Sequence, residues 1–179
     1  MRTVDRIRAA RRRDERGFGL VELLIAMTML VIGILALFAM FQSGILQIRR
    51  ASTVSTASAL AEAEMENYRA IKYDSIGLAT ADITPIPSTD PYKTDSAYIP
   101  ASLVTLPKCP AVPPCTSSLP TQTKTAADGR SYRVDTFMSW QTVTNGRNVK
   151  LVTIVVRDST NTSKVWARVV SSFDESTGL

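Results

Sequence analysis

Residues 16–41 read "RGFGLVELLIAMTMLVIGILALFAMF", and this stretch decides how the chain is organised. Residues 23–41 contain no charge and no proline, and Thr28 is their only polar side chain. A helix of that length rises about 28 Å, which matches the hydrocarbon core of a bilayer. The stretch therefore predicts a transmembrane helix. It also raises the question of why a carboxylate, Glu22, stands at the entrance of an apolar segment.

The charge of the chain is concentrated before this segment. Residues 1–17 carry seven arginines against three acidic residues, whereas residues 18–179 carry 14 basic and 13 acidic residues. Positively charged flanks stay in the cytoplasm, so we expect the leader inside the cell and the chain from about residue 45 onward outside it. The nearly neutral remainder has little electrostatic attraction to nucleic acid.

The composition argues against an enzyme. The chain has no histidine, which removes the commonest general base and the commonest metal ligand. Its two cysteines, Cys109 and Cys115, cannot complete a zinc site by themselves, and no glycine-rich phosphate-binding motif is present. We therefore expect no catalytic activity, no cofactor, no metal and no small-molecule substrate.

Two ordinary interpretations of the N-terminus stay open. A cleaved secretory signal has an apolar core of about 7–15 residues followed by a small-x-small cleavage site. The core here is longer, and the sequence "ALFAMFQSG" (36–44) has no convincing site of that kind. An uncleaved single-pass anchor is the other alternative.

The residues ahead of the apolar run favour a third interpretation. The short basic leader, followed by Gly17, Phe18, Leu20, Val21 and Glu22, resembles the class III signal of type IV prepilins. The resemblance implies that a prepilin peptidase cuts after Gly17 and methylates the new N-terminus at Phe18. It also implies that Glu22, five residues after the cut, is the carboxylate used in assembly. The family usually has Ser or Thr after the phenylalanine, where this chain has glycine.

Physical chemistry gives Glu22 a role in such a protein. The new amine of Phe18 is a cation, and residues four apart share one face of a helix. The same amine of a neighbouring staggered subunit can also meet Glu22. An unpaired charge in apolar surroundings costs about 2–4 kcal/mol, so pairing favours subunits that stack in register. The alternative is a carboxylate that sits unpartnered at the headgroup boundary.

The helix is predicted to continue well beyond the membrane, over residues 18–73. No proline interrupts it, since the first proline of the chain is Pro85. One apolar stripe recurs at steps of three and four residues: Val54, Ala57, Ala61, Met65, Tyr68 and Ile71. The segments "GFGLVELLIAM" (17–27) and "SALAEAEMENYRAIKYDSI" (58–76) together resemble PilV-like minor pilins and the pseudopilin I group of type II secretion.

The middle of the chain predicts irregular structure. All nine prolines lie between Pro85 and Pro120, so residues 74–130 cannot form a continuous helix or a central strand, although a short edge strand fits residues 97–106. Cys109 and Cys115 flank the loop "PAVPP". Outside the cytoplasm we expect them to form a disulfide, and two free cysteines remain the alternative.

The last third of the chain predicts an antiparallel sheet over residues 131–173, followed by a tail at 174–179. Residues 131–143 alternate, Asn145-Gly146 is a strong hairpin signal, and residues 149–157 are apolar on both faces, as in a covered central strand. A third strand fits residues 164–173. The outer half of the helix is the natural cover, so we expect an α+β, pilin-like fold.

These observations favour a structural subunit, either a minor pilin or a pseudopilin of a type IV pilus or type II secretion-like filament. The resemblance implies three partners: the prepilin peptidase, other pilin or pseudopilin subunits, and the cytoplasmic membrane before incorporation into a filament. The alternative is a membrane-anchored adhesin or binding domain outside the cell that does not polymerise. Cleavage after Gly17 separates the two, because a plain anchor needs no such cut.

Overall fold

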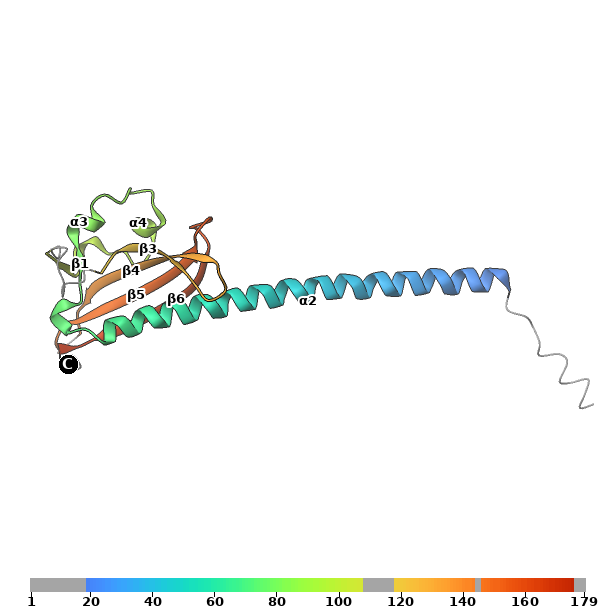
Figure 1. Cartoon of the computed structure of the whole chain (residues 1–179), viewed down its shortest axis with the longest axis horizontal. Helices are drawn as coiled ribbons and strands as arrows, with labels where there is room; N and C mark the ends of the chain where they lie inside the picture. The colour runs from blue at the N-terminus through green and yellow to red at the C-terminus, as the bar shows by residue number, and fades with distance from the viewer. Residues whose placement is uncertain (1–18, 108–117, 144–145, 176–179) are drawn as a thin grey trace, which may run out of the picture. The chain divides into compact units, whose positions relative to one another are not determined.

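The computed structural model describes residues 19–107, 118–143 and 146–175 of the chain. It divides the chain into two compact units, Met1–Arg49 and Arg50–Leu179. Helix α2, Leu20–Arg69, contributes to both units, and its inner segment (residues 20–49) and outer segment (residues 50–69) are described separately (Figure 1). The predicted helix over residues 18–73 is therefore confirmed apart from its ends.

A four-stranded antiparallel sheet forms the second unit. The strand order is β3-β4-β5-β6, so every strand pairs with its neighbour in sequence. The bounds are Thr121–Thr125 for β3, Ser131–Gln141 for β4, Val149–Asp158 for β5 and Val165–Phe173 for β6. In the β4–β5 hairpin Val134 lies opposite Val156, and Asn145 of the predicted turn lies outside the described residues.

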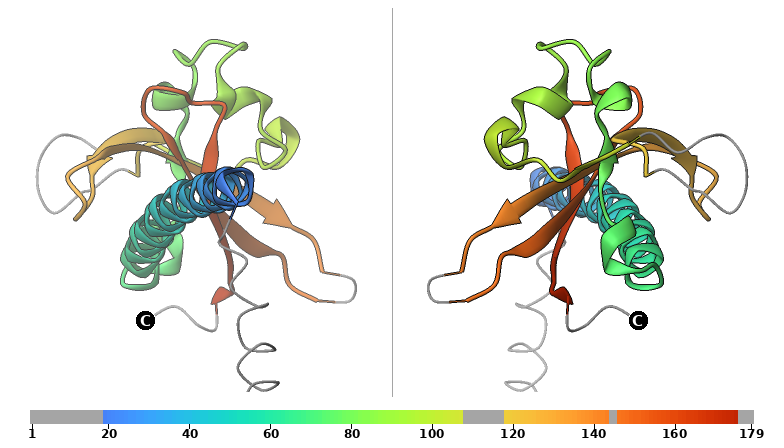
Figure 2. Two further views of the ribbon diagram at one scale, coloured as in Figure 1. Left: turned by 90° about the vertical axis from the view of Figure 1, so that its right-hand side faces the viewer. Right: turned by 90° about the vertical axis from the view of Figure 1, so that its left-hand side faces the viewer.

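The outer segment of α2 covers one face of this sheet (Figure 2). Its buried apolar side chains are Ala57, Ala61, Met65 and Tyr68, four members of the predicted stripe. The Gln122 amide donates to the Glu64 carboxylate over 3.3 Å, and Lys124 pairs with the same group. Since Gln122 lies opposite Val134 in the sheet, the helix packs on the face that carries Val134 and Ile154. This confirms the α+β architecture.

The opposite face is also covered, by the segment of residues 76–107. Tyr92 stacks on Phe137 with ring centroids 4.5 Å apart, and its hydroxyl donates to the Thr136 carbonyl oxygen over 3.1 Å. The segment contains only short elements: η1 Tyr73–Ser75 just before it, then β1 Leu78–Ala79, α3 Thr80–Ile83, α4 Pro91–Thr94, η2 Pro100–Ser102 and β2 Thr105–Leu106. We call residues 76–107 the covering segment.

The covering segment agrees in part with the sequence analysis. Of the edge strand that fits residues 97–106, only Thr105 and Leu106 are a strand, and they pair in parallel with Leu78 and Ala79. Gly77 permits this pairing, because a Cβ at that position would lie 2.4 Å from Leu106 Cγ. Strand β3 was missed, since its sequence "TQTKT" lies in the region predicted to be irregular.

Candidate functional site: the N-terminal helix and the globular unit

The inner segment of α2 is an apolar helix with every side chain exposed. Large hydrophobic residues occur all around it; the Met40 side chain, for example, is 73% exposed. Thr28, its one uncharged polar residue between positions 23 and 41, donates its hydroxyl to the Ile25 carbonyl oxygen over 2.8 Å. The helix is long and apolar enough to cross a membrane, by length and composition. Such a surface needs lipid or other protein around it.

Glu22 lies in the first turn of α2 and is exposed. Its backbone N–H donates to the Gly19 carbonyl oxygen over 2.9 Å, so the helical hydrogen bonds begin at Gly19. A carboxylate in the first turn is favourable because it faces the positive end of the helix dipole. Gly17 and Phe18, the predicted cleavage and methylation positions, lie outside the described residues, as do Cys109 and Cys115.

The globular unit contains a chain of alternating charges, which we call the ionic clamp: Asp90, Arg133, Asp135, Arg157, Asp95 and Arg168. Asp135 is fully buried and accepts hydrogen bonds from Arg133 Nε at 2.7 Å and Arg157 Nε at 2.8 Å. Arg133 also pairs with Asp90, and Arg157 pairs with Asp95. Both outer aspartates belong to the covering segment, so the clamp ties that segment to the sheet.

The carboxylates of the clamp differ in their electrostatics. Hydrogen bonds from Arg133 hold the pKa of Asp90 below its usual value. Burial by itself would raise the pKa of Asp95. Hydrogen bonds from the Ala97 backbone N–H and the Arg168 guanidinium outweigh burial, so the pKa of Asp95 is lowered as well. At Asp135 burial prevails over two arginines and raises the pKa. Every charge of the clamp has an opposite partner, and the pairs join the covering segment to the sheet.

Lys150 fixes the turn that follows α2. Its ammonium donates to the carbonyl oxygens of Tyr73 and Ile76, at 2.7 Å and 2.9 Å, and lies 4.3 Å from the centre of the Tyr73 ring. Burial lowers the pKa of this amine. Because Lys150 belongs to the central strand β5, these bonds attach the turn after α2 to the sheet.

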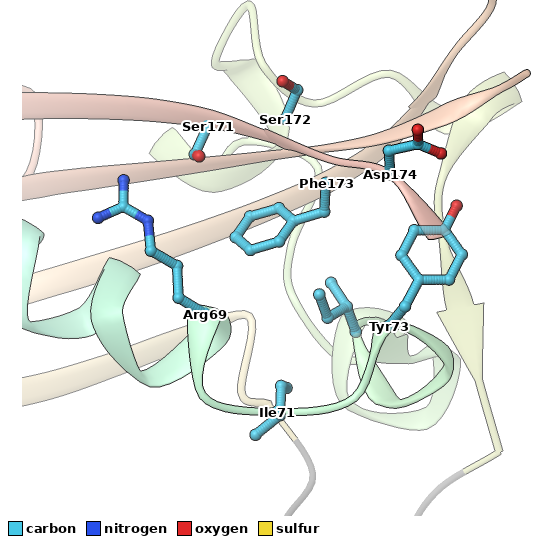
Figure 3. Close-up of a pocket in the computed structure, with 8 residues that line it drawn as sticks. Arg69, Ile71, Tyr73, Ser171, Ser172, Phe173 and Asp174 are labelled. Atoms are coloured by element: carbon cyan, nitrogen blue, oxygen red, sulfur yellow. The ribbon is translucent and has the colours of Figure 1, made fainter. Parts of the chain in front are cut away.

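A cavity of about 290 Å³ opens between the chain after α2 and the end of β6 (Figure 3). Its apolar lining comes from Ile71, Ile76 and Phe173, and Arg69 and Ser171 also line it. Arg69 pairs with Glu66 one turn earlier in the helix. Within the described residues, no cluster of His, Cys, Asp and Glu side chains could hold a metal ion.

Glu22 could be named from the sequence, whereas the ionic clamp and the role of Lys150 could not. Arg133 and Asp135 lie within the alternating residues 131–143, and Lys150 lies within the run 149–157 that was predicted to be apolar on both faces. One signal was present: a charged residue inside an otherwise covered strand must find a partner. The partners lie 43 residues away for Arg133 and 74 to 77 residues away for Lys150, so the pairs could not be named.

Comparison with known proteins concerns the N-terminal segment. Residues 12–38 match the family model described as the prokaryotic N-terminal methylation motif. No curated protein and no solved structure matches the chain. The matched range contains the predicted cleavage position, Glu22 and most of the apolar run. The chain therefore carries a prepilin-like N-terminal signal on an apolar helix that fits a membrane anchor, ahead of an α+β globular unit.

Proposed function

We propose that this protein is a minor pilin or pseudopilin, a structural subunit of a type IV pilus or type II secretion-like filament. One observation carries the proposal: the methylation motif at residues 12–38 overlaps the inner segment of α2 (residues 20–49), which is largely apolar and has every side chain exposed. A signal that is removed together with its apolar core leaves no such surface. A cut before the helix keeps it for the membrane and for other subunits.

In this proposal the prepilin peptidase cuts between Gly17 and Phe18 and methylates the Phe18 amine. The basic leader stays in the cytoplasm, and the globular unit lies outside the cytoplasmic membrane until the subunit enters a filament. The cut places a cationic amine four residues before Glu22, close to the helix start at Gly19. The methylated amine and Glu22 are then within reach of each other along one helix or between two.

Glu22 acts as a registration group. Two unit charges 4 Å apart in surroundings of effective dielectric near 20 attract each other by about 4 kcal/mol, and desolvation reduces this gain. A subunit stacked out of register keeps the desolvation cost without the attraction. The correct axial position is therefore favoured at every contact between subunits.

The processing step tests the proposal. The full chain is expressed with its prepilin peptidase, and the mature protein is analysed by intact mass and N-terminal sequencing. We expect a chain that starts at N-methyl-Phe18, and a Gly17→Ala variant that retains its leader. A wild-type chain that keeps residues 1–17 under these conditions would favour the anchored, non-polymerising adhesin instead.

A further inference from the structure

The two edges of the sheet differ in length and chemistry. Strand β3 is a five-residue edge whose lysine, Lys124, already pairs with Glu64 of α2, whereas β6 is a nine-residue edge without lysine or proline. Natural edge strands are usually shortened or carry charges and prolines that prevent pairing with another chain. Among the described residues no further strand pairs with the outer side of β6. This edge is therefore able to accept another strand.

The remaining features of β6 do not protect it. Its only charged residue, Arg168, is engaged by the covering segment, since its guanidinium donates to both carboxylate oxygens of Asp95, at 2.9 Å and 2.8 Å. The bulge opposite Val156 and Arg157 affects only the start of the strand. Residues 167–173 continue in regular register, and the side chain of Val170 in their centre is 51% exposed.

The cavity of Figure 3 lies beside the same part of β6. Ser171, Ser172 and Phe173 line it from the strand, and Ile71 lines it from the chain after α2. A strand added to the edge at residues 170–173 would run past this cavity. Side chains on its helix-facing side would then have a partly apolar space to enter.

The directions of the two edge strands decide which strand of a second copy can pair with β6. In an antiparallel sheet of four strands, the two edge strands β3 and β6 run in opposite directions. Two copies that share one orientation can therefore extend the sheet by pairing β6 antiparallel with β3 of the neighbour. Antiparallel β6–β6 pairing needs a two-fold axis normal to the sheet, which would reverse the outer segment of α2 in one copy. Subunits that enter a filament from one membrane share one orientation, so this step rests on the proposed function.

The side chains of the two edges are complementary. Thr121, Thr123 and Thr125 lie on the face of the sheet that carries Asp135 and Arg133, and Val170 and Ser172 lie on the same face of β6. Cross-strand pairs of β-branched residues and of hydroxyl residues stabilise sheets. We propose that β6 of one copy pairs antiparallel with β3 of the next, with Thr125 opposite Val170 and Thr123 opposite Ser172. This register places the new strand beside the cavity.

Disulfide trapping tests the pairing in the full chain, in membranes and in sheared filaments. One copy carries Val170→Cys and a differently tagged copy carries Thr125→Cys, both in a Cys109→Ser, Cys115→Ser background. Opposed residues in neighbouring strands have Cα atoms about 4.5–5.5 Å apart, which a disulfide accepts. We expect a mixed-tag dimer after mild oxidation, at least fivefold more abundant than with Val169→Cys, whose side chain lies on the opposite face of the sheet.

Three results would overturn this inference: an equal yield from Val169→Cys, a dominant dimer between two Val170→Cys copies, or no dimer in filaments that contain both variants. Analysis of the N-terminus in the same samples separates the two proposals. A processed, incorporated subunit without the mixed-tag dimer refutes only the strand pairing. An unprocessed chain refutes the filament role itself.

Discussion

At the scale of single residues, charge placement is the most informative feature of this protein. Glu22 is exposed in the first turn of an apolar helix, whereas Asp135 is fully buried between two arginines. The fold pairs Asp135 with both guanidinium groups. Under the proposed function Glu22 acts in assembly, through the Phe18 amine that processing would create, whereas Asp135 acts in folding.

Replacement of Glu22 tests the registration role. Glu22→Val removes the attraction to the Phe18 amine but leaves Gly17 and the apolar run intact, so processing and membrane insertion should persist. A loss of about 1–2 kcal/mol for each contact would lower recovery in sheared filaments by a factor of about 5–30. Immunoblots of sheared and membrane fractions measure this ratio.

The matched control is Glu62→Gln, an exposed carboxylate on the outer segment of α2. This variant should enter filaments as the wild type does. If Glu22→Val also enters at the wild-type level, Glu22 is only a boundary residue.

Replacement of Asp135 should destabilise the globular unit. Asp135→Asn leaves Arg133 and Arg157 without their shared carboxylate, and breaking a buried ion pair in this way costs about 3–5 kcal/mol. Denaturant unfolding of the full chain in detergent, followed by the fluorescence of Trp140 and Trp166, gives the change. A loss no larger than that of Glu62→Gln would mean that the clamp adds little stability.

At the scale of elements, α2 combines two different kinds of surface. The inner segment has only exposed side chains, whereas the outer segment buries a stripe against the sheet. The same helix therefore has one part that depends on its surroundings and one that depends on the fold. The same substitution made once in each segment should therefore affect the stability of the globular unit differently.

Met65 and Met40 provide such a pair. Met65 is fully buried between the outer segment and the sheet, and Met40 is exposed. Met65→Ala should lower the free energy of unfolding of the globular unit by about 2–5 kcal/mol through lost burial and a new cavity. Met40→Ala should leave it unchanged. Tryptophan fluorescence measures both, and equal effects would contradict the packing of the outer segment on the sheet.

The loop between β2 and β3 contains Cys109 and Cys115, for which we predict an intramolecular disulfide after export. Mass spectrometry with and without reduction should show that thiol-alkylating reagents modify the cysteines only after reduction. Closure of so short a loop contributes about 2 kcal/mol, so Cys109→Ser should leave the sheet folded, with the wild-type circular dichroism spectrum. Alkylation of unreduced protein taken from the cell envelope would refute the disulfide.

At the scale of the whole molecule, the shifted pKa values of five aspartates, three of them in the ionic clamp, predict how stability depends on pH. The pKa values of Asp90 and Asp95 in the clamp are lowered. The pKa of Asp128 is lowered by a hydrogen bond from the Tyr132 hydroxyl, and that of Asp158 by hydrogen bonds from the backbone N–H groups of Asn161 and Thr160. Each such carboxylate stabilises the folded state above its unfolded pKa, near 3.9, and this contribution disappears as the pH falls through the lower folded value. Asp135, whose pKa is raised, has the opposite dependence.

Four carboxylates have a lowered pKa and only Asp135 has a raised one among the aspartates with a shifted pKa. We therefore expect the free energy of unfolding to decrease below about pH 4. Urea midpoints between pH 2.5 and pH 7 measure the effect, and Asp90→Asn should flatten the decrease. A midpoint that rises on acidification would show that Asp135 dominates the titration.

The sequence by itself determined the elements whose signals are local. An uninterrupted run of helix-compatible residues determined α2, and alternation before a two-residue turn signal determined the β4–β5 hairpin. The apolar character of both faces determined that β5 is central, and the structure places β5 between β4 and β6 with both faces covered. Glu22 could be named for the same reason, because its meaning depends on neighbours within a few positions.

Only the tertiary structure decided where the charges and the irregular segment lie. The sequence of β3 alternates but has no apolar face to mark it as part of a core, and it becomes a strand by pairing with the edge of β4. Tyr92 and Asp90 take their places through Phe137 and Arg133, more than 40 residues away. A charge can be buried only where an oppositely charged group lies beside it in the folded structure. A sequence pattern, in contrast, shows only which residues are neighbours along the chain. That difference is why the helix was predictable and the clamp was not.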